Sequence, residues 1–150
     1  MSKHQPHKDI MKYYSDNYAS IEWDADLKCI KTTITGIPRH SHHFRLIQRK
    51  RIEFISLLKE RFGDFNLLTD SRKAGPLIPE DVSFFKSKIV PRLASLGVTR
   101  MAVLEPESIF SRLVVRDMVE GSTKVKLQVF SDENQAKDWL LSARPIEAVA

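Results

Sequence analysis

An acid and a serine, Asp70 and Ser71, stand where an apolar run meets a glycine turn in LLTDSRKAGPLIPED, residues 67–81. A phosphate added near a helix N-terminus is held by free N–H groups and the helix dipole. The pair is therefore a candidate regulatory or polar binding site. Asp and Ser also commonly hydrogen-bond within their own turn. We favour this second interpretation, in which Asp70 ends a strand and Ser71 belongs to the turn that follows.

Two other polar groups have suitable residue types but lack the partners that chemistry requires. His40, His42 and His43 carry metal-binding imidazoles, yet no HExxH motif or cysteine set completes a zinc site. We expect them in an exposed loop that leads into a helix. Glu105 and Glu107 follow an apolar run, where acidic side chains complement the dipole of a starting helix.

Nothing else in the sequence supplies a catalytic set. Cys29 is the only cysteine, and its apolar and β-branched neighbours favour a buried, inert thiol. There is no glycine-rich phosphate loop and no nucleophile elbow. We predict a protein that is not an enzyme, with no catalytic residue, cofactor or bound metal.

The composition sets broad limits on the class of protein. A chain of 150 residues with 42% hydrophobic residues suits a single domain. A formal net charge of +5 indicates a basic surface but falls short of a nucleic-acid footprint, and we expect no nucleic-acid partner. No apolar run reaches the roughly 20 residues of a membrane span, and the N-terminus lacks the apolar core of a secretory signal. We expect a soluble, cytoplasmic protein without a membrane span.

Hydrophobic periodicity predicts alternating strands and helices after a polar lead-in. The expected strands cover residues 19–24, 29–35, 65–70, 99–104 and 125–130, and the expected helices cover 42–62, 82–96, 105–121 and 131–143. Pro91 should kink or split the second helix, because it lacks an N–H and its ring clashes with the preceding turn. Gly63 and Gly97 should end the first two helices.

The helix over residues 42–62 carries a basic run that includes Arg45 and Arg49. Helical spacing places both on a stripe with Glu53 and Glu60, which indicates a solvated face. Arg51 differs because the same spacing places it within the apolar stripe. We expect its stem to pack and its guanidinium to reach an acid or the rim, as ordinary packing and not as a ligand site.

The predicted order is a β-hairpin followed by αβ units, which indicates an α/β fold. Strands joined through helices should be parallel, so the sheet is mixed but mostly parallel, with about five strands and about four helices. We predict a flexible N-terminal tail over residues 1–17, one domain over 18–144 and a C-terminal tail over 145–150.

This order resembles the STAS domain, the SpoIIAA-like fold of the bacterial anti-anti-sigma factors. LLTDSRKAGPLIPED, VPRLASLGVTRMAVLEPESIF and VFSDENQAKDWL are similar to small bacterial STAS/SEC14-like proteins, and the resemblance covers residues 19–143. In anti-anti-sigma factors a strand ends in an acid, and a kinase phosphorylates a serine that opens the next helix. Asp70 matches that acid, but AGPLIPED contains no hydroxyl residue. The resemblance therefore implies a STAS-like module without the phospho-switch serine.

The resemblance implies a non-catalytic regulatory or protein-interaction module, whose partner is another protein or a second copy of the chain. The candidate partner surface consists of Asp70, Ser71, Leu77, Ile78, Glu105 and Phe110. The alternative is a carrier of a small apolar ligand or lipid, of STAS/SEC14-like type. Its pocket would lie between the sheet and a helix and would be lined by Phe84, Phe85, Ile109 and Phe110.

Overall fold

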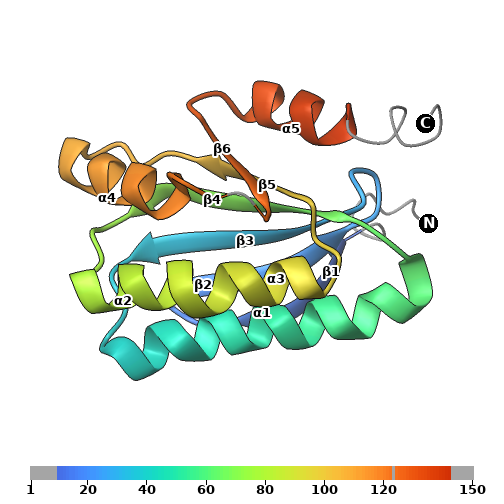
Figure 1. The fold of residues 1–150 in the computed structure, drawn as a ribbon, viewed down its shortest axis with the longest axis horizontal. Coiled ribbons are helices and arrows are strands. Elements are labelled where there is room, and N and C mark those ends of the chain that lie inside the picture. Colours follow the sequence, from blue (N-terminus) through green and yellow to red (C-terminus); the bar gives the residue numbers. More distant parts are fainter. Residues whose placement is uncertain (1–9, 123, 143–150) are drawn as a thin grey trace, which may run out of the picture.

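The computed structural model describes residues 10–122 and 124–142, which form one mixed sheet of six strands with helices on both faces (Figure 1). The strands are β1 (Ile10–Ser15), β2 (Ala19–Asp24), β3 (Cys29–Gly36), β4 (Asn66–Ala74), β5 (Arg100–Leu104) and β6 (Lys126–Phe130). The helices are α1 (Ser41–Phe62), α2 (Pro79–Phe84), the π-helical η2 (Phe85–Ile89), α3 (Val90–Ser95), α4 (Ile109–Val119) and α5 (Glu133–Leu141).

The strands lie side by side in chain order. β1 pairs antiparallel with β2, and β2 pairs antiparallel with β3, whereas β3 to β6 pair with one another in parallel. Right-handed crossovers that all advance in one direction place their helices on one face of the sheet. That face carries α1, α2 to α3, and α4, while α5 covers the other face (Figure 1). The predicted α/β class is confirmed, with six strands in place of about five.

β1 corrects the predicted N-terminal tail. Residues 10–15 pair antiparallel with β2, and the ring of Tyr13 stacks on Phe54 of α1 with 4.5 Å between ring centroids. The predicted tail over 1–17 is therefore wrong for residues 10–15. Strand pairing and ring stacking give this segment enough buried contact to order it, although its sequence is polar. Residues 1–9 and the predicted tail over 145–150 lie outside the described residues.

The helices follow the sequence signals closely. α1 ends at Gly63, whose φ of 72° places it in the left-handed region that glycine tolerates best. The predicted interruption at Pro91 is confirmed. The chain forms a π-turn before the proline, in which the N–H of Val90 donates to the carbonyl of Phe85. No helix in the described part of the chain is long and apolar enough to cross a membrane.

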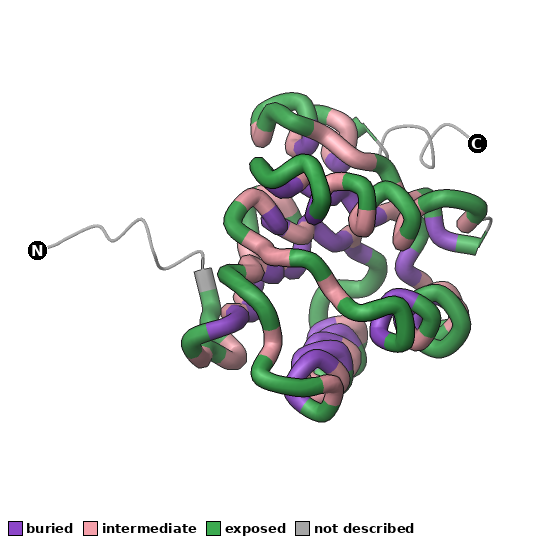
Figure 2. The backbone as a smooth tube through the Cα atoms, turned by 90° about the vertical axis from the view of Figure 1, so that its left-hand side faces the viewer, coloured by how far each residue is buried: buried purple, intermediate pink, exposed green. Residues whose placement is uncertain are grey.

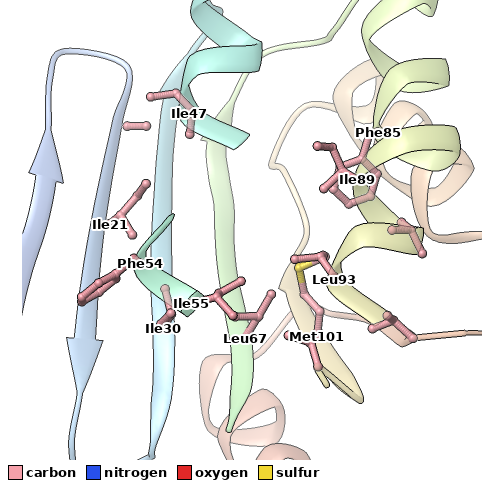
Figure 3. Packing of buried hydrophobic residues seen from close by; sticks show 14 of the residues in the cluster. Ile21, Ile30, Ile47, Phe54, Ile55, Leu67, Phe85, Ile89, Leu93 and Met101 are labelled. Atoms are coloured by element: carbon pink, nitrogen blue, oxygen red, sulfur yellow. The ribbon is translucent and has the colours of Figure 1, made fainter. Parts of the chain in front are cut away.

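Two hydrophobic clusters hold the layers together, one on each face of the sheet. The larger lies under α1 and α3, where Figure 3 shows residues that include Ile47, Phe54, Leu67, Leu93 and Met101. The smaller joins Leu68, Ala102, Leu104, Ala136 and Leu140 beneath α5. Figure 2 shows buried residues in the middle of the molecule with exposed ones around them.

The packing of β1 generates a testable prediction. Replacement of Tyr13 by Ala removes the ring that stacks on Phe54 and should lower the free energy of unfolding by about 2 kcal/mol. The matched variant Tyr13→Phe keeps the ring and removes only the exposed hydrogen bond to Glu53, so it should change the value by less than about 0.5 kcal/mol. Chemical denaturation monitored by circular dichroism measures both. Equal effects of the two variants would contradict a structural role for this strand.

Candidate functional site

A cavity of about 70 Å³ lies between the sheet and the helices on its larger face. Its floor consists of Thr32, Ile34, Thr69, Ser71, Met101 and Val103 from the three central strands. Its walls include Tyr18, Phe44, Gln48, Arg51, Phe85, Val114, Val115, Met118 and Val119. The volume corresponds to roughly two water molecules at their share of liquid volume, and most of the lining side chains are apolar.

Arg51 is the one charged residue among those lining the cavity. Its place in the apolar stripe of α1 buries it to 3% exposure. The guanidinium donates to Gln48 Oε1 at 2.5 Å and to Thr69 Oγ1 at 3.2 Å, and it contacts the sulfur of Met101 at 3.7 Å. No carboxylate of the described residues lies within 4.0 Å of its nitrogen atoms. The expectation that Arg51 reaches an acid or the rim is therefore wrong.

The polar groups of the cavity are incompletely hydrogen-bonded. Nε of Arg51 and Oγ1 of Thr32 are buried and have no partner among the described residues. Burial lowers the pKa of Arg51 to about 10, so it still carries its charge at neutral pH. Burial also raises the pKa of Tyr18, and the negative charges of Asp81 and Asp16 raise it further. The cavity thus contains a desolvated cation without an adjacent counter-charge.

Helix α4 closes one side of the cavity and is loosely held. Ser111 is its only buried residue, whereas Ile109, Phe110 and Leu113 are 64%, 73% and 61% exposed. The predicted pocket lining is therefore right for Phe85 and wrong for Ile109 and Phe110. Both side chains lie on the exposed side of the helix, away from the cavity lining.

Phe84, the fourth residue of the predicted pocket lining, also lies outside the cavity. Its ring packs under the guanidinium of Arg45 at 4.3 Å from the ring centroid. Arg45 is half-buried, so the predicted solvated face is wrong at this position. Arg49, Glu53 and Glu60 are exposed as predicted.

Asp70 and Ser71 lie within a strand and not at its end. β4 continues to Ala74, and its register with β3 slips by one residue between Asp70 and Lys73. Asp70 accepts from Nε of Arg72 at 3.0 Å and from Nη2 at 2.8 Å. Burial opposes ionisation of Asp70, but Arg72 outweighs it and lowers the pKa. The predicted strand end at Asp70 and turn at Ser71 are wrong, because β4 stays paired with β3 through a bulge as far as Ala74.

Ser71 and Asp70 occupy opposite faces of β4. Ser71 is 6% exposed and lines the cavity, so it is not part of an exposed switch loop. Asp70 faces α5, where Arg72 also binds Glu133 at 2.9 Å. The alternation of side chains along the strand thus places two neighbouring residues in two environments.

The other candidate residues also divide between the cavity and the outer surface. Leu77 lines the cavity, and Ile78 beside it is 51% exposed. Glu105 is held by ion pairs to Arg116 at 3.1 Å and to Arg112 at 3.8 Å. Leu77 therefore belongs to a different surface from Ile78, and Glu105 is occupied by neighbours on α4.

The histidines and Cys29 have structural roles. Nδ1 of His40 caps α1 by accepting from the backbone N–H of His43 at 3.2 Å. His43 is buried and its Nε2 lies 2.8 Å from Asp16, so the expected exposed loop is wrong for this residue. Cys29 is fully buried as predicted, and burial raises its pKa to about 12. The described residues contain no group of three or more potential His, Cys, Asp or Glu metal ligands.

Sequence reasoning missed Thr32, Thr69 and Gln48 as parts of the site. Gln48 and Arg51 are one helical turn apart on an otherwise apolar stripe. Two polar residues in that position are a usable signal, because buried polar groups are normally paired. Thr32 and Thr69 give no such signal, since threonine is common in strands.

Comparisons with known proteins leave the family open. No protein-family model, curated protein or solved structure matches this chain. The geometry of the cavity is therefore the basis for a functional proposal.

The Asp16 cluster, next to Tyr18 at the cavity wall, predicts a pH dependence of stability. Burial favours the neutral acid, but hydrogen bonds from Tyr14, His43 and two backbone N–H groups outweigh it and lower the Asp16 pKa. Because folding lowers the pKa of this carboxyl group, its ionisation stabilises the protein at pH values above 3.8, the ordinary pKa of the group. This stabilisation is lost as the pH falls through the pKa of the folded protein.

Replacement of Asp16 by Asn should lower the free energy of unfolding at pH 6 by about 2 kcal/mol. The difference from the parent protein should shrink between pH 5 and pH 2, measured by urea denaturation at each pH. A difference that stays constant over this range would contradict the role assigned to the carboxylate.

Proposed function

We propose that this protein binds and carries a small, mainly apolar ligand in the cavity, without catalysing a reaction. The observation that supports this proposal is the cavity itself. It lies between the sheet and the helices and has an apolar lining with a few polar groups at one place. Sites for small molecules typically combine an apolar lining with a small number of placed polar groups. A well-packed core leaves few voids larger than a water molecule, so a cavity of about 70 Å³ calls for an explanation.

The weak attachment of α4 supplies a route for entry. Two ion pairs hold the outer side of α4. Asp117 of α4 pairs with Lys86 of η2 at 3.3 Å, and Arg116 of α4 pairs with Glu105 at 3.1 Å. Ion pairs with such exposed cationic partners contribute little stability. An outward shift of α4 would enlarge the cavity while the core beneath α1 stays intact. The proposal therefore assigns α4 the role of a movable cover.

The fold order supports this assignment as well. A β-meander followed by three helical crossovers resembles the STAS domain. The carrier that the sequence suggested as the alternative function is of STAS/SEC14-like type. We include a STAS-like fold in the proposal. We rank ligand binding ahead of the interaction module, because an interaction surface alone would not need a cavity.

Protein interaction is the second candidate, and one observation favours it. Ile78, Ile109, Phe110 and Leu113 are all more than half exposed. They belong to α4 and to the segment entering α2, and these two helices contact each other. Extended apolar surface on a protein commonly marks a contact site. Such a surface would serve delivery of a ligand as well as regulation of a partner.

A pair of variants on α4 tests the carrier proposal. Val115→Trp points a large ring into the cavity and should weaken binding of the uncharged fluorescent probe N-phenyl-1-naphthylamine at least tenfold. Leu113→Trp places the same ring on the exposed outer face and should leave binding within twofold. Fluorescence titration measures both affinities, and circular dichroism checks the fold. Equal loss in the two variants would place the probe on the outer surface and contradict the proposal.

The interaction candidate has its own test. A double variant, Ile78→Ser with Phe110→Ser, should abolish self-association or partner capture by the tagged protein in cells of its native host. Leu57→Ser on α1 is the matched control, since Leu57 is 57% exposed and lies on a different helix. Light scattering after size-exclusion chromatography measures self-association, and quantitative mass spectrometry measures capture. Unchanged association in the double variant would remove this candidate.

A further inference from the structure

We infer that the ligand is a monoanionic amphiphile, a carboxylate on a hydrocarbon body, whose carboxylate pairs with the guanidinium of Arg51 inside the cavity. The inference rests on the proposed function and adds the chemical class of the ligand. Its hydrocarbon body would lie against Phe85, Val115 and Met118, beneath α4.

The charge of Arg51 is the first argument. A buried ion costs several kcal/mol unless a counter-ion or a full set of hydrogen bonds offsets the loss of water. The guanidinium has five N–H donors, and its partners are one amide oxygen, one hydroxyl and one sulfur, a weak acceptor. Within the described part of the chain no carboxylate approaches it within 4.0 Å. An anion in the cavity would supply the missing partner.

The unpartnered polar atoms are the second argument. Thr32 is 1% exposed and lines the cavity, and its hydroxyl has no partner among the described residues. Nε of Arg51 is likewise buried and has no hydrogen-bond partner among the described residues. A carboxylate accepts several hydrogen bonds through its two oxygens and pairs well with the planar guanidinium. One such group could therefore accept from Arg51 and Thr32 together.

The single cation limits the charge of the ligand. Asp81, at the start of α2, is 2% exposed, and one of its carboxylate oxygens has no partner among the described residues. Its negative charge raises the pKa of Tyr18 at the cavity wall, whereas the positive charge of Arg51 lowers that pKa. A dianionic phosphate would bring two negative charges to a lining with one cation, Arg51. A monoanion balances Arg51 without excess negative charge, which favours a carboxylate.

Octanoate and 1-octanol, which share a chain length and differ in charge, test this inference. Isothermal titration calorimetry on the full chain at pH 7.5 should show at least tenfold tighter binding of octanoate. Arg51→Met should weaken octanoate at least tenfold and leave 1-octanol within twofold, since it keeps a side chain of similar length without the charge. Arg51→Lys should keep part of the preference. Arg49→Met removes an exposed charge from the same helix and should change neither affinity.

The outcomes separate this inference from the proposed function. Equal binding of the two ligands overturns the anionic class and leaves the carrier proposal standing, and binding of neither overturns both. Loss of octanoate preference in Arg49→Met would indicate a surface charge effect and overturn the role of Arg51. Thermal unfolding checks each variant. If Arg51→Met does not fold, the comparison of ligands in the parent protein and in Arg51→Lys still decides the result.

Discussion

The right-handed crossover is the constraint on which the rest of this structure depends. The strands lie in chain order, so each of the three β–helix–β connections places its helix on the same face of the sheet. α1, the broken α2 to α3 segment and α4 must share that face, and α5 alone remains for the other. The cavity lies over the central strands, where α1, the α2 to α3 segment and α4 meet. It is a consequence of how three helices share one face.

Arg51 gives that cavity its chemical character. A side chain of this size in the stripe of α1 fills space as an apolar residue would, but its charge remains desolvated and only partly hydrogen-bonded. A ligand that binds only the folded state and supplies the missing anion would stabilise the protein as its concentration rises. Binding and stability are thereby linked through one side chain.

Two other polar clusters, around Asp70 and around Asp16, are satisfied within the chain, unlike Arg51. Asp70 is held by Arg72, and Arg72 continues to Glu133, which also binds Lys31 and Lys137. Asp16 is held by four hydrogen bonds from groups that include His43. These groups attach α5 and the N-terminal end of α1 to the sheet. The residues whose types first suggested chemistry thus serve mainly to join elements.

The sequence by itself determined the α/β class, the extent of α1, the break at Pro91 and the burial of Cys29, because each depends on local periodicity, on backbone restrictions or on immediate neighbours. It also placed Arg51 in an apolar stripe. Only the tertiary structure decided that β1 joins the sheet, that Ser71 and Leu77 face one cavity, and that no acid within residues 10–122 and 124–142 pairs with Arg51. These features depend on which distant segments lie opposite one another, and on the continuation of β4 past Asp70, which keeps Ser71 within the strand. Local patterns do not encode such pairings.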